Sequence, residues 1–367
     1  MEYGGAQRQV VELANHINPD VFKIHVCSLS DYVPLSSELK LGDERLHIAR
    51  KQHKFDLTVA FKLAHLFRKL KADLVHTFLF DADFFGRLGA MLARVPVIIG
   101  SERNCFEEPR FRNLAAWRLT QPLVDLTIAN SNAGADFNQR MLHQPRSSYR
   151  VVHNGVNVNR FTPKDGKDLR GELNIKADEK IVGIFGSFKP QKNHETFFRV
   201  AKMVLQQLPQ TRFLVVGDEL YLGMSNSVEW KQKIQNLVDE LGLRERCLFL
   251  GNRKDVERLY NICDVTVLPS LFEGTPNVAL ESMACGVPVI ASDVSDNKYV
   301  IPDGKAGFVV AVNDVDSMAQ RVVSLLSNDA ERIRFGQNAR EWVLKEFSCE
   351  RLAEKTVAVY QEALSRK

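Results

Sequence analysis

Short apolar runs alternate with longer segments of helical periodicity along almost the whole chain. In the first half, the apolar runs lie at 22–29, 72–77, 97–100 and 126–130. Segments between them, such as 57–70, carry apolar residues at helical spacing. Strands that alternate with helices are typical of a parallel sheet covered by crossover helices. The first half therefore predicts a doubly wound α/β domain.

The second half repeats this rhythm. Its predicted strands lie at 181–186, 211–216, 247–250, 265–268, 287–292 and 307–310. A chain of 367 residues is too long for one ordinary core and fits two domains. We expect the linker in the charged stretch 162–179, followed by a second doubly wound domain.

A short predicted helix places two carboxylates on either side of a helix start. Thr275 is the expected N-cap, and Pro276 takes the first helical position. Glu273 precedes the helix and Glu281 lies inside it, so their backbones should be roughly 7–10 Å apart. This separation is too large for a shared proton but suits the two ends of one extended ligand.

Phosphate-binding groups are expected beside these carboxylates. The N–H groups of Asn277 and Val278 lie at the positive end of the helix. The loop at 186–193 brings Lys189 and Lys192 beside backbone amides, where they can neutralise a diphosphate leaving group. A nucleotide-diphosphate sugar fits this pattern. A glycosidase with two carboxylates is the alternative, but hydrolysis has no use for phosphate-binding groups.

This region resembles the retaining GT-B glycosyltransferases of family four. The matching residues are Glu273, Gly274, Pro276, Glu281, Ala284, Gly286, Pro288, Val289, Ile290 and Ala291. The resemblance implies two doubly wound Rossmann-like domains with a cleft between them. It implies an acceptor-side domain at 1–165, a nucleotide-sugar domain at 166–345, and a helix at 346–367 that crosses back to the first domain.

The resemblance also implies roles for individual residues. Glu273, facing the sugar, and Lys192, on the phosphates, would be catalytic, and Glu281 would accept hydrogen bonds from the ribose hydroxyls. Ser187 stands where most members have arginine, so one positive charge is missing. The implied donor-binding residues are Gly5, Gly186, Ser187, Lys192, Asn252, Arg253, Gly274, Thr275, Pro276, Asn277, Val278 and Glu281.

The first domain departs from the family pattern at its start. Family members carry a G-G-A-E/Q-R turn that a buried strand precedes. Here the turn lies at 4–8, and Met1 stands only three residues before Gly4. The resemblance therefore implies that the first strand is missing from this chain and that the first domain is weakened.

Charge and cysteine usage restrict the partners and the compartment. The 49 basic and 45 acidic residues give a net charge of +4, which is far from the profile of a nucleic-acid-binding protein. The six cysteines are scattered, which favours structural thiols in a reducing compartment. No apolar run approaches the roughly 18 residues of a membrane span. These features predict a cytoplasmic protein.

Candidate acceptor-side residues lie in the first domain. His76 follows a predicted strand and is either a core histidine or a site residue. One mixed aromatic and basic group comprises Phe106, Arg110, Phe111, Arg112, Trp117 and Arg118. A basic group comprises Lys51, His53, Lys54, Lys62, Arg68, Lys69 and Lys71. Peripheral contact with the anionic inner face of the cytoplasmic membrane and an ordinary solvated surface both fit these groups.

The combined interpretation is a retaining glycosyltransferase. It would move a sugar from a nucleotide-diphosphate sugar to a glycan or lipid-linked glycan in cell-surface polysaccharide biosynthesis. We expect no metal, since the chain lacks a D-x-D pair in a plausible loop, and no cofactor besides the sugar nucleotide as co-substrate. Two alternatives remain open: a weak or inactive nucleotide-sugar-binding partner subunit, which Ser187 favours, and a GT-B sugar epimerase.

Overall fold

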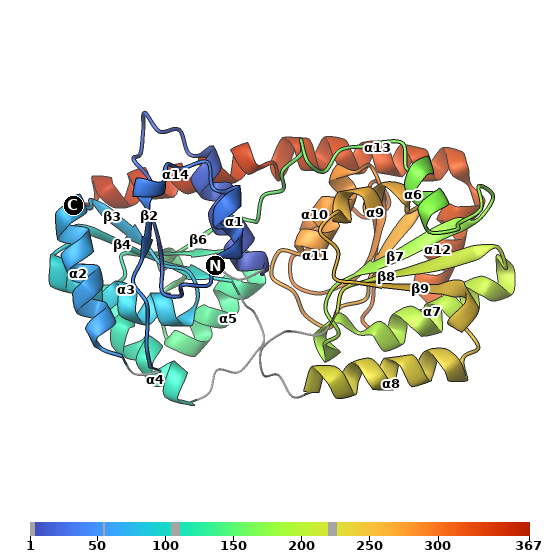
Figure 1. Ribbon diagram of the computed structural model, residues 1–367, viewed down its shortest axis with the longest axis horizontal. Coiled ribbons are helices and arrows are strands. Elements are labelled where there is room, and N and C mark those ends of the chain that lie inside the picture. The colour runs from blue at the N-terminus through green and yellow to red at the C-terminus, as the bar shows by residue number, and fades with distance from the viewer. Residues whose placement is uncertain (1–3, 54–55, 104–110, 219–225) are drawn as a thin grey trace. The chain divides into compact units, whose positions relative to one another are not determined.

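The computed structural model describes residues 4–53, 56–103, 111–218 and 226–367 (Figure 1). The chain forms two compact units. Unit 1 comprises Met1–Gly155 and Cys349–Lys367, and unit 2 comprises Val156–Ser348. The first unit thus ends before the expected boundary at 165, and the expected linker at 162–179 contributes buried residues such as Leu169 and Ile175 to the core of unit 2.

Unit 1 contains two parallel sheets. A two-stranded sheet pairs β1 with β2, and a four-stranded sheet has the order β3-β4-β5-β6. Its strands are β1 (Val26–Ser28), β2 (Leu46–Ile48), β3 (Leu74–His76), β4 (Val97–Glu102), β5 (Leu126–Ala129) and β6 (Tyr149–Val151). Its helices are α1 (Gly5–His16), α2 (Thr58–Leu70), α3 (Phe80–Ala93), α4 (Phe111–Thr120), α5 (Asn132–Leu142) and α14 (Cys349–Ser365).

The C-terminal helix α14 belongs to the core of unit 1. Its residues Leu352 and Tyr360 share one apolar cluster with Leu13 of α1 and with Ile99 and Ile128 of the sheet. Apolar positions on one face of α14 therefore hold it against elements that lie more than 200 positions earlier in the sequence.

A cavity of about 1490 Å³ separates the two sheets of unit 1. Residues of α1, β1, β3 and α14 line it, and they include Val10, Val26, Val75 and Tyr360. β1 and β3 are each the last strand of their sheet on the described part of the chain.

Unit 2 is built on one six-stranded parallel sheet in the order β12-β11-β10-β7-β8-β9. Its strands are β7 (Lys180–Phe185), β8 (Thr211–Val216), β9 (Cys247–Gly251), β10 (Val265–Leu268), β11 (Val289–Ser292) and β12 (Gly307–Val310). Its helices are α6 (Lys167–Glu172), α7 (His194–Gln207), α8 (Asn226–Glu240), α9 (Val256–Ile262), α10 (Asn277–Ala284), α11 (Asn297–Val300), α12 (Val315–Ser327) and α13 (Asp329–Glu346).

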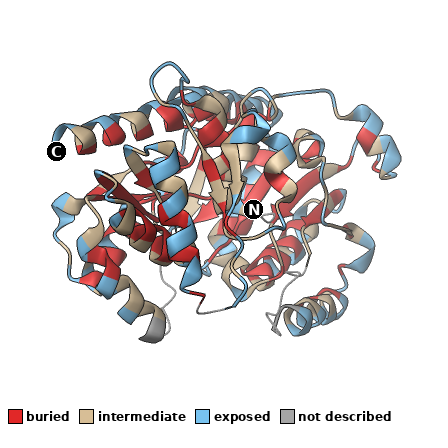
Figure 2. Cartoon of the chain, turned by 60° about the vertical axis from the view of Figure 1, so that its left-hand side comes forward, coloured by how far each residue is buried: buried red, intermediate tan, exposed pale blue. Residues whose placement is uncertain are grey.

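The sheet of unit 2 is buried on both faces, as its continuous apolar strands require. Along β7, Ile181 and Phe185 enter one apolar cluster, whereas Val182 and Ile184 enter the cluster on the other face. These β7 residues are buried, and in Figure 2 the exposed residues, drawn in pale blue, lie mainly on helices and loops. The strand order reverses between β7 and β10, and ligands of such sheets bind outside the carboxyl ends of the strands at this switch point.

Candidate active site

The loops that follow β7 and β10 bring Lys192 and Glu273 into contact. The Lys192 ammonium donates to Oε1 of Glu273 at 2.6 Å, and the Ser270 hydroxyl donates to the same oxygen at 2.7 Å. The side chains of Lys192 and Glu273 are only 17% and 8% exposed. A carboxylate buried to this extent needs such partners. Both residues predicted to be catalytic therefore form one ion pair at the switch point.

Backbone contacts hold the two loops together. The Leu271 N–H donates to the carbonyl of Gln191 at 2.9 Å, and the Gln191 amide donates to the carbonyl of Phe272 at 2.9 Å. The side chain of Asn193 donates to the carbonyl of Pro269 at 3.1 Å. These three hydrogen bonds between the loops thus help to hold Lys192 and Glu273 in contact.

The loop at 186–193 depends on backbone forms that favour glycine. Gly217 has a φ of +134°, and a Cβ there would lie 2.2 Å from the carbonyl oxygen of Gly186. Phe188, beside Ser187, is buried and stacks on His194 with ring centroids 4.6 Å apart. Burial and the Lys192 charge lower the pKa of His194 to about 3, so its imidazole is neutral at physiological pH.

Helix α10 starts one residue later than the sequence suggested. Pro276 is the N-cap, with extended backbone, and its carbonyl accepts from the Ala279 N–H at 3.1 Å. The prediction of Thr275 as N-cap and Pro276 as the first helical residue was therefore wrong, because Pro276 keeps a ψ of 105° outside the helical range. Asn277 and Val278 still contribute the first N–H groups of the helix, which lack acceptors within it.

Glu281 lies in the second turn of α10 and contacts α9. The hydroxyl of Tyr260 donates to Oε2 of Glu281 at 2.9 Å. The Tyr260 ring stacks on Phe185 of β7, with centroids 3.9 Å apart and planes 20° apart. Sequence reasoning missed Tyr260, because an aromatic residue in an apolar helix reads as ordinary core.

The remaining donor-binding candidates lie at the start of α1 and after β9. Asn252 and Arg253 follow β9, and the Arg253 guanidinium forms two hydrogen bonds of 2.8 Å with the carboxylate of Asp255. This pairing lowers the pKa of Asp255. Gly5 is the first residue of α1 in unit 1, whereas the other candidates belong to unit 2.

His76 is held within unit 1. Its two ring nitrogens lie 2.7 Å from the hydroxyls of Tyr360 and Ser101. Burial, with the charge of Arg103, lowers its pKa to about 3. Both ring nitrogens of His76 therefore have partners within unit 1. Phe106 and Arg110, proposed for the acceptor surface, lie outside the described residues.

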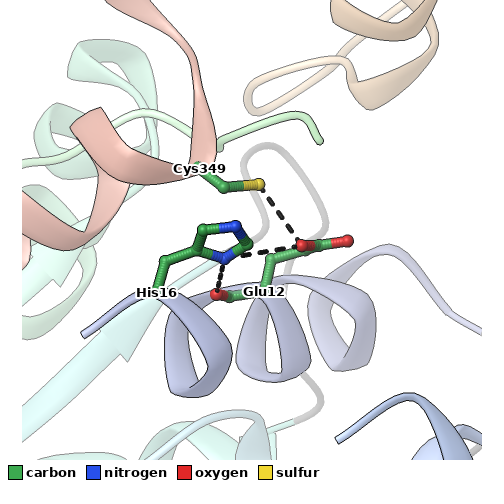
Figure 3. Close-up of side chains that lie close together, drawn as sticks. All are labelled: Glu12, His16 and Cys349. Atoms are coloured by element: carbon green, nitrogen blue, oxygen red, sulfur yellow. Dashed lines mark hydrogen bonds and ion pairs between the residues drawn. The ribbon is translucent and has the colours of Figure 1, made fainter. Parts of the chain in front are cut away.

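Among the described residues of unit 1, the side chains of Glu12, His16 and Cys349 form a group of the mixed type that can bind a metal (Figure 3). Their ligand atoms lie within 4.8 Å of one another. The Cys349 thiol donates to Oε2 of Glu12 at 3.4 Å, and Nδ1 of His16 donates to the Glu12 carbonyl at 2.7 Å. Burial and the Glu12 carboxylate raise the pKa of the Cys349 thiol well above its usual range. The group therefore acts as a hydrogen-bonded contact between α1 and α14.

None of the helices described by the structure is both long and apolar enough to span a bilayer.

Two family models match the chain. The model "Glycosyl transferases group 1" matches residues 165–342, and the model "Glycosyltransferase Family 4" matches residues 3–160. One relative is the UDP-Gal:alpha-D-GlcNAc-diphosphoundecaprenol alpha-1,3-galactosyltransferase of Escherichia coli, 27% identical over 85% of this chain and 81% of that protein. Another is the D-inositol 3-phosphate glycosyltransferase of Mycobacterium marinum, 31% identical over 58% of this chain. That match spans 45% of the relative's length.

Solved structures share the fold. Anabaena Alr3699/HepE, in complex with UDP and glucose, superposes with a TM-score of 0.85 over 98% of this chain and 96% of that chain, at 21% identity. The two family models together account for most of the chain, and each covers one set of parallel strands and helices. The chain therefore belongs to the group 1 glycosyltransferases and has the GT-B fold of two Rossmann-like domains.

Proposed function

We propose that this protein transfers a sugar, with retention of configuration, from a nucleotide-diphosphate sugar to a hydroxyl of a glycan or lipid-linked glycan. The observation that carries the proposal is the buried Lys192–Glu273 pair at the switch point of unit 2. The galactosyltransferase relative acts on a diphosphoundecaprenol-linked sugar, which favours a role in cell-surface polysaccharide biosynthesis. The UDP bound to Alr3699/HepE favours a nucleotide donor.

The leaving diphosphate is the centre of the proposed mechanism. As the glycosidic bond to the diphosphate breaks, negative charge develops on the phosphate oxygens. The Lys192 ammonium and the first N–H groups of α10 can stabilise this charge without a metal ion. Ser187 adds no charge of its own, so Lys192 carries more of the electrostatic load than in members with arginine at this position.

The two carboxylates hold the uncharged ends of the donor. Glu273 accepts hydrogen bonds from Lys192 and Ser270, and it can bind sugar hydroxyls and stabilise positive charge at the anomeric carbon. Glu281 can accept from both ribose hydroxyls, because a carboxylate offers about four lone-pair sites. The two carboxylates would thus hold the sugar and the ribose while the bond between the sugar and the diphosphate breaks.

A binding role without transfer is the second candidate function. The observation that favours it is Ser187, because the loop at 186–193 lacks the positive charge that an arginine at this position would supply. A subunit of this kind would bind a nucleotide sugar through the same residues but would leave its glycosidic bond intact.

The test is a matrix of donors and acceptors. UDP-, GDP- and ADP-sugars are incubated with the protein and with an N-acetylglucosamine-diphosphate lipid or a short glycan, and both nucleotide release and sugar transfer are measured. The proposal predicts transfer from one donor class. Thermal stabilisation by a donor without transfer to any acceptor supports the binding role, and the absence of both effects contradicts both functions.

A further inference from the structure

Tyr260 combines a buried aromatic ring with a hydroxyl that has one carboxylate acceptor. It lies in α9 and is only 1% exposed. Its ring stacks on Phe185, and the edge of Phe161 lies 6.0 Å from it, centroid to centroid. A phenylalanine would fill this apolar site equally well. The hydroxyl therefore needs a reason beyond packing, and its bond to Glu281 supplies one.

We propose that Tyr260 is a positioning residue for the nucleotide ribose. Its hydroxyl holds Oε2 of Glu281, so that the carboxylate is already oriented to accept the ribose hydroxyls when the donor arrives. This inference rests on the proposed function, because it assumes that Glu281 binds a nucleotide. It adds a residue on a different helix to the donor site and explains how a carboxylate on a short helix is held in one rotamer.

The direction of the hydrogen bond is fixed by charge. Burial and the Glu281 carboxylate raise the pKa of Tyr260 well above its usual value, so the phenol stays protonated and donates. A hydrogen bond to an ionised acceptor is stronger and shorter than one between neutral groups. The Tyr260 bond takes up one of the roughly four lone-pair sites of the carboxylate.

Helix α9 is a rigid support for this hydroxyl. The flanking residues Leu259 and Ile262 are buried in the apolar cluster of unit 2. Asn261, next to Tyr260, donates to the carbonyl of Thr162 at 3.0 Å, and Glu257 pairs with Arg160 at 3.0 Å. A carboxylate held from such an element loses less freedom when it binds a ligand, which is the physical basis of preorganised affinity.

The experiment compares the wild type with Tyr260→Phe, which keeps the ring and its stacking but deletes the hydroxyl. Binding of UDP, GDP and ADP and of their 2′-deoxy forms is measured by calorimetry, and kcat and KM are measured for the active donor. We expect the variant to bind the preferred nucleotide about fivefold more weakly, because the lost hydroxyl acts on the nucleotide only through the orientation of Glu281. The ratio of the affinities for the ribose and the 2′-deoxyribose nucleotide should be smaller in the variant than in the wild type, while kcat changes less than twofold.

Tyr149→Phe is the matched control. Tyr149 is a buried tyrosine of unit 1 whose hydroxyl donates to Asn138 at 2.6 Å, so the variant loses an equally buried hydroxyl elsewhere. It should leave nucleotide binding and the ribose preference unchanged.

Three outcomes would overturn the inference. Wild-type affinity and ribose preference in Tyr260→Phe would do so, and so would a lower melting temperature with an unchanged ribose preference, which indicates packing alone. If the wild type binds no nucleoside diphosphate, the proposed function fails and this inference fails with it. The wild-type titration therefore separates the two failures.

Discussion

The contact between Lys192 and Glu273 is the feature of the candidate site on which the proposed function depends most. Sequence reasoning identified both residues from their loops but did not predict that they touch, because the distance between two loops follows from strand order. In the sheet, β10 lies beside β7, so the loop after each strand reaches the same switch point. Residue types were thus predictable, whereas their pairing required the topology.

Replacing Lys192 should weaken donor use strongly. In Lys192→Ala, the phosphate loses a cation and Glu273 loses its buried partner, so kcat/KM should fall. The lost transition-state stabilisation should be about 1.5–3 kcal/mol, the value of a charged hydrogen bond. Steady-state kinetics with the active donor measures this. Lys180→Ala is the control, since Lys180 pairs with Asp329 at 2.7 Å at the opposite end of β7 and should have little effect. Equal kinetics in Lys192→Ala and Lys180→Ala would show that Lys192 does not act in the donor site.

The buried side chain of His194, which follows the loop at 186–193, should make the stability of the protein depend on pH. The pKa of His194 is about 3 in the folded protein and about 6.5 when unfolded, so the unfolded chain binds the extra proton between these values. Stability should therefore fall as pH decreases from 6.5 toward 3, by up to about 1.4 kcal/mol per pH unit from this group. His194→Phe keeps an aromatic ring beside Phe188. Urea unfolding at pH 7.5 and 5.5 should show a smaller pH loss for this variant, and identical losses would contradict the assignment.

At the scale of elements, hydrophobic patterns predicted most strands and helices but not their edges. The strand expected at 22–29 is reduced to β1, and β2 and β6 were not predicted as strands, since three residues give too little alternation to detect. The start of α10 was misplaced by one residue because Pro276 keeps a ψ of 105°, outside the helical range, so the helix begins at Asn277. Side-chain contacts across elements, such as Tyr260 with Glu281, have no signal in a single sequence.

The cavity of unit 1 leads to a prediction about an added strand. β1 pairs with β2 on one side, and its residues line the cavity with those of β3. A strand that enters α1 and returns through β1 by a right-handed crossover would lie between β1 and β3. A chain lengthened before Glu2 by about five to six apolar residues, the typical length of a strand, should therefore melt several degrees higher.

Thermal unfolding of the lengthened chain measures this effect. A Gly/Ser extension of equal length is the control, since it adds chain without apolar surface. If the apolar and Gly/Ser extensions melt at the same temperature, the cavity does not accept a strand.

For the molecule as a whole, the proposed mechanism leaves the negative charge of the phosphates to groups of the protein. We propose that the Lys192 ammonium and the first N–H groups of α10 stabilise this charge, as a divalent cation does in other transferases. We therefore expect EDTA to leave the transfer rate unchanged within twofold. A loss of activity in EDTA that added magnesium or manganese restores would show that the site needs a metal.

The configuration of the transferred sugar shows whether transfer proceeds with retention. Proton NMR can follow the anomeric signal of an α-linked nucleotide-sugar donor during transfer to the acceptor. The account predicts an α-linked product that forms in the wild type and is strongly reduced in Lys192→Ala. A β-linked product would contradict the retaining mechanism, and an equal rate of α-product formation in the variant would contradict the role of the Lys192–Glu273 pair.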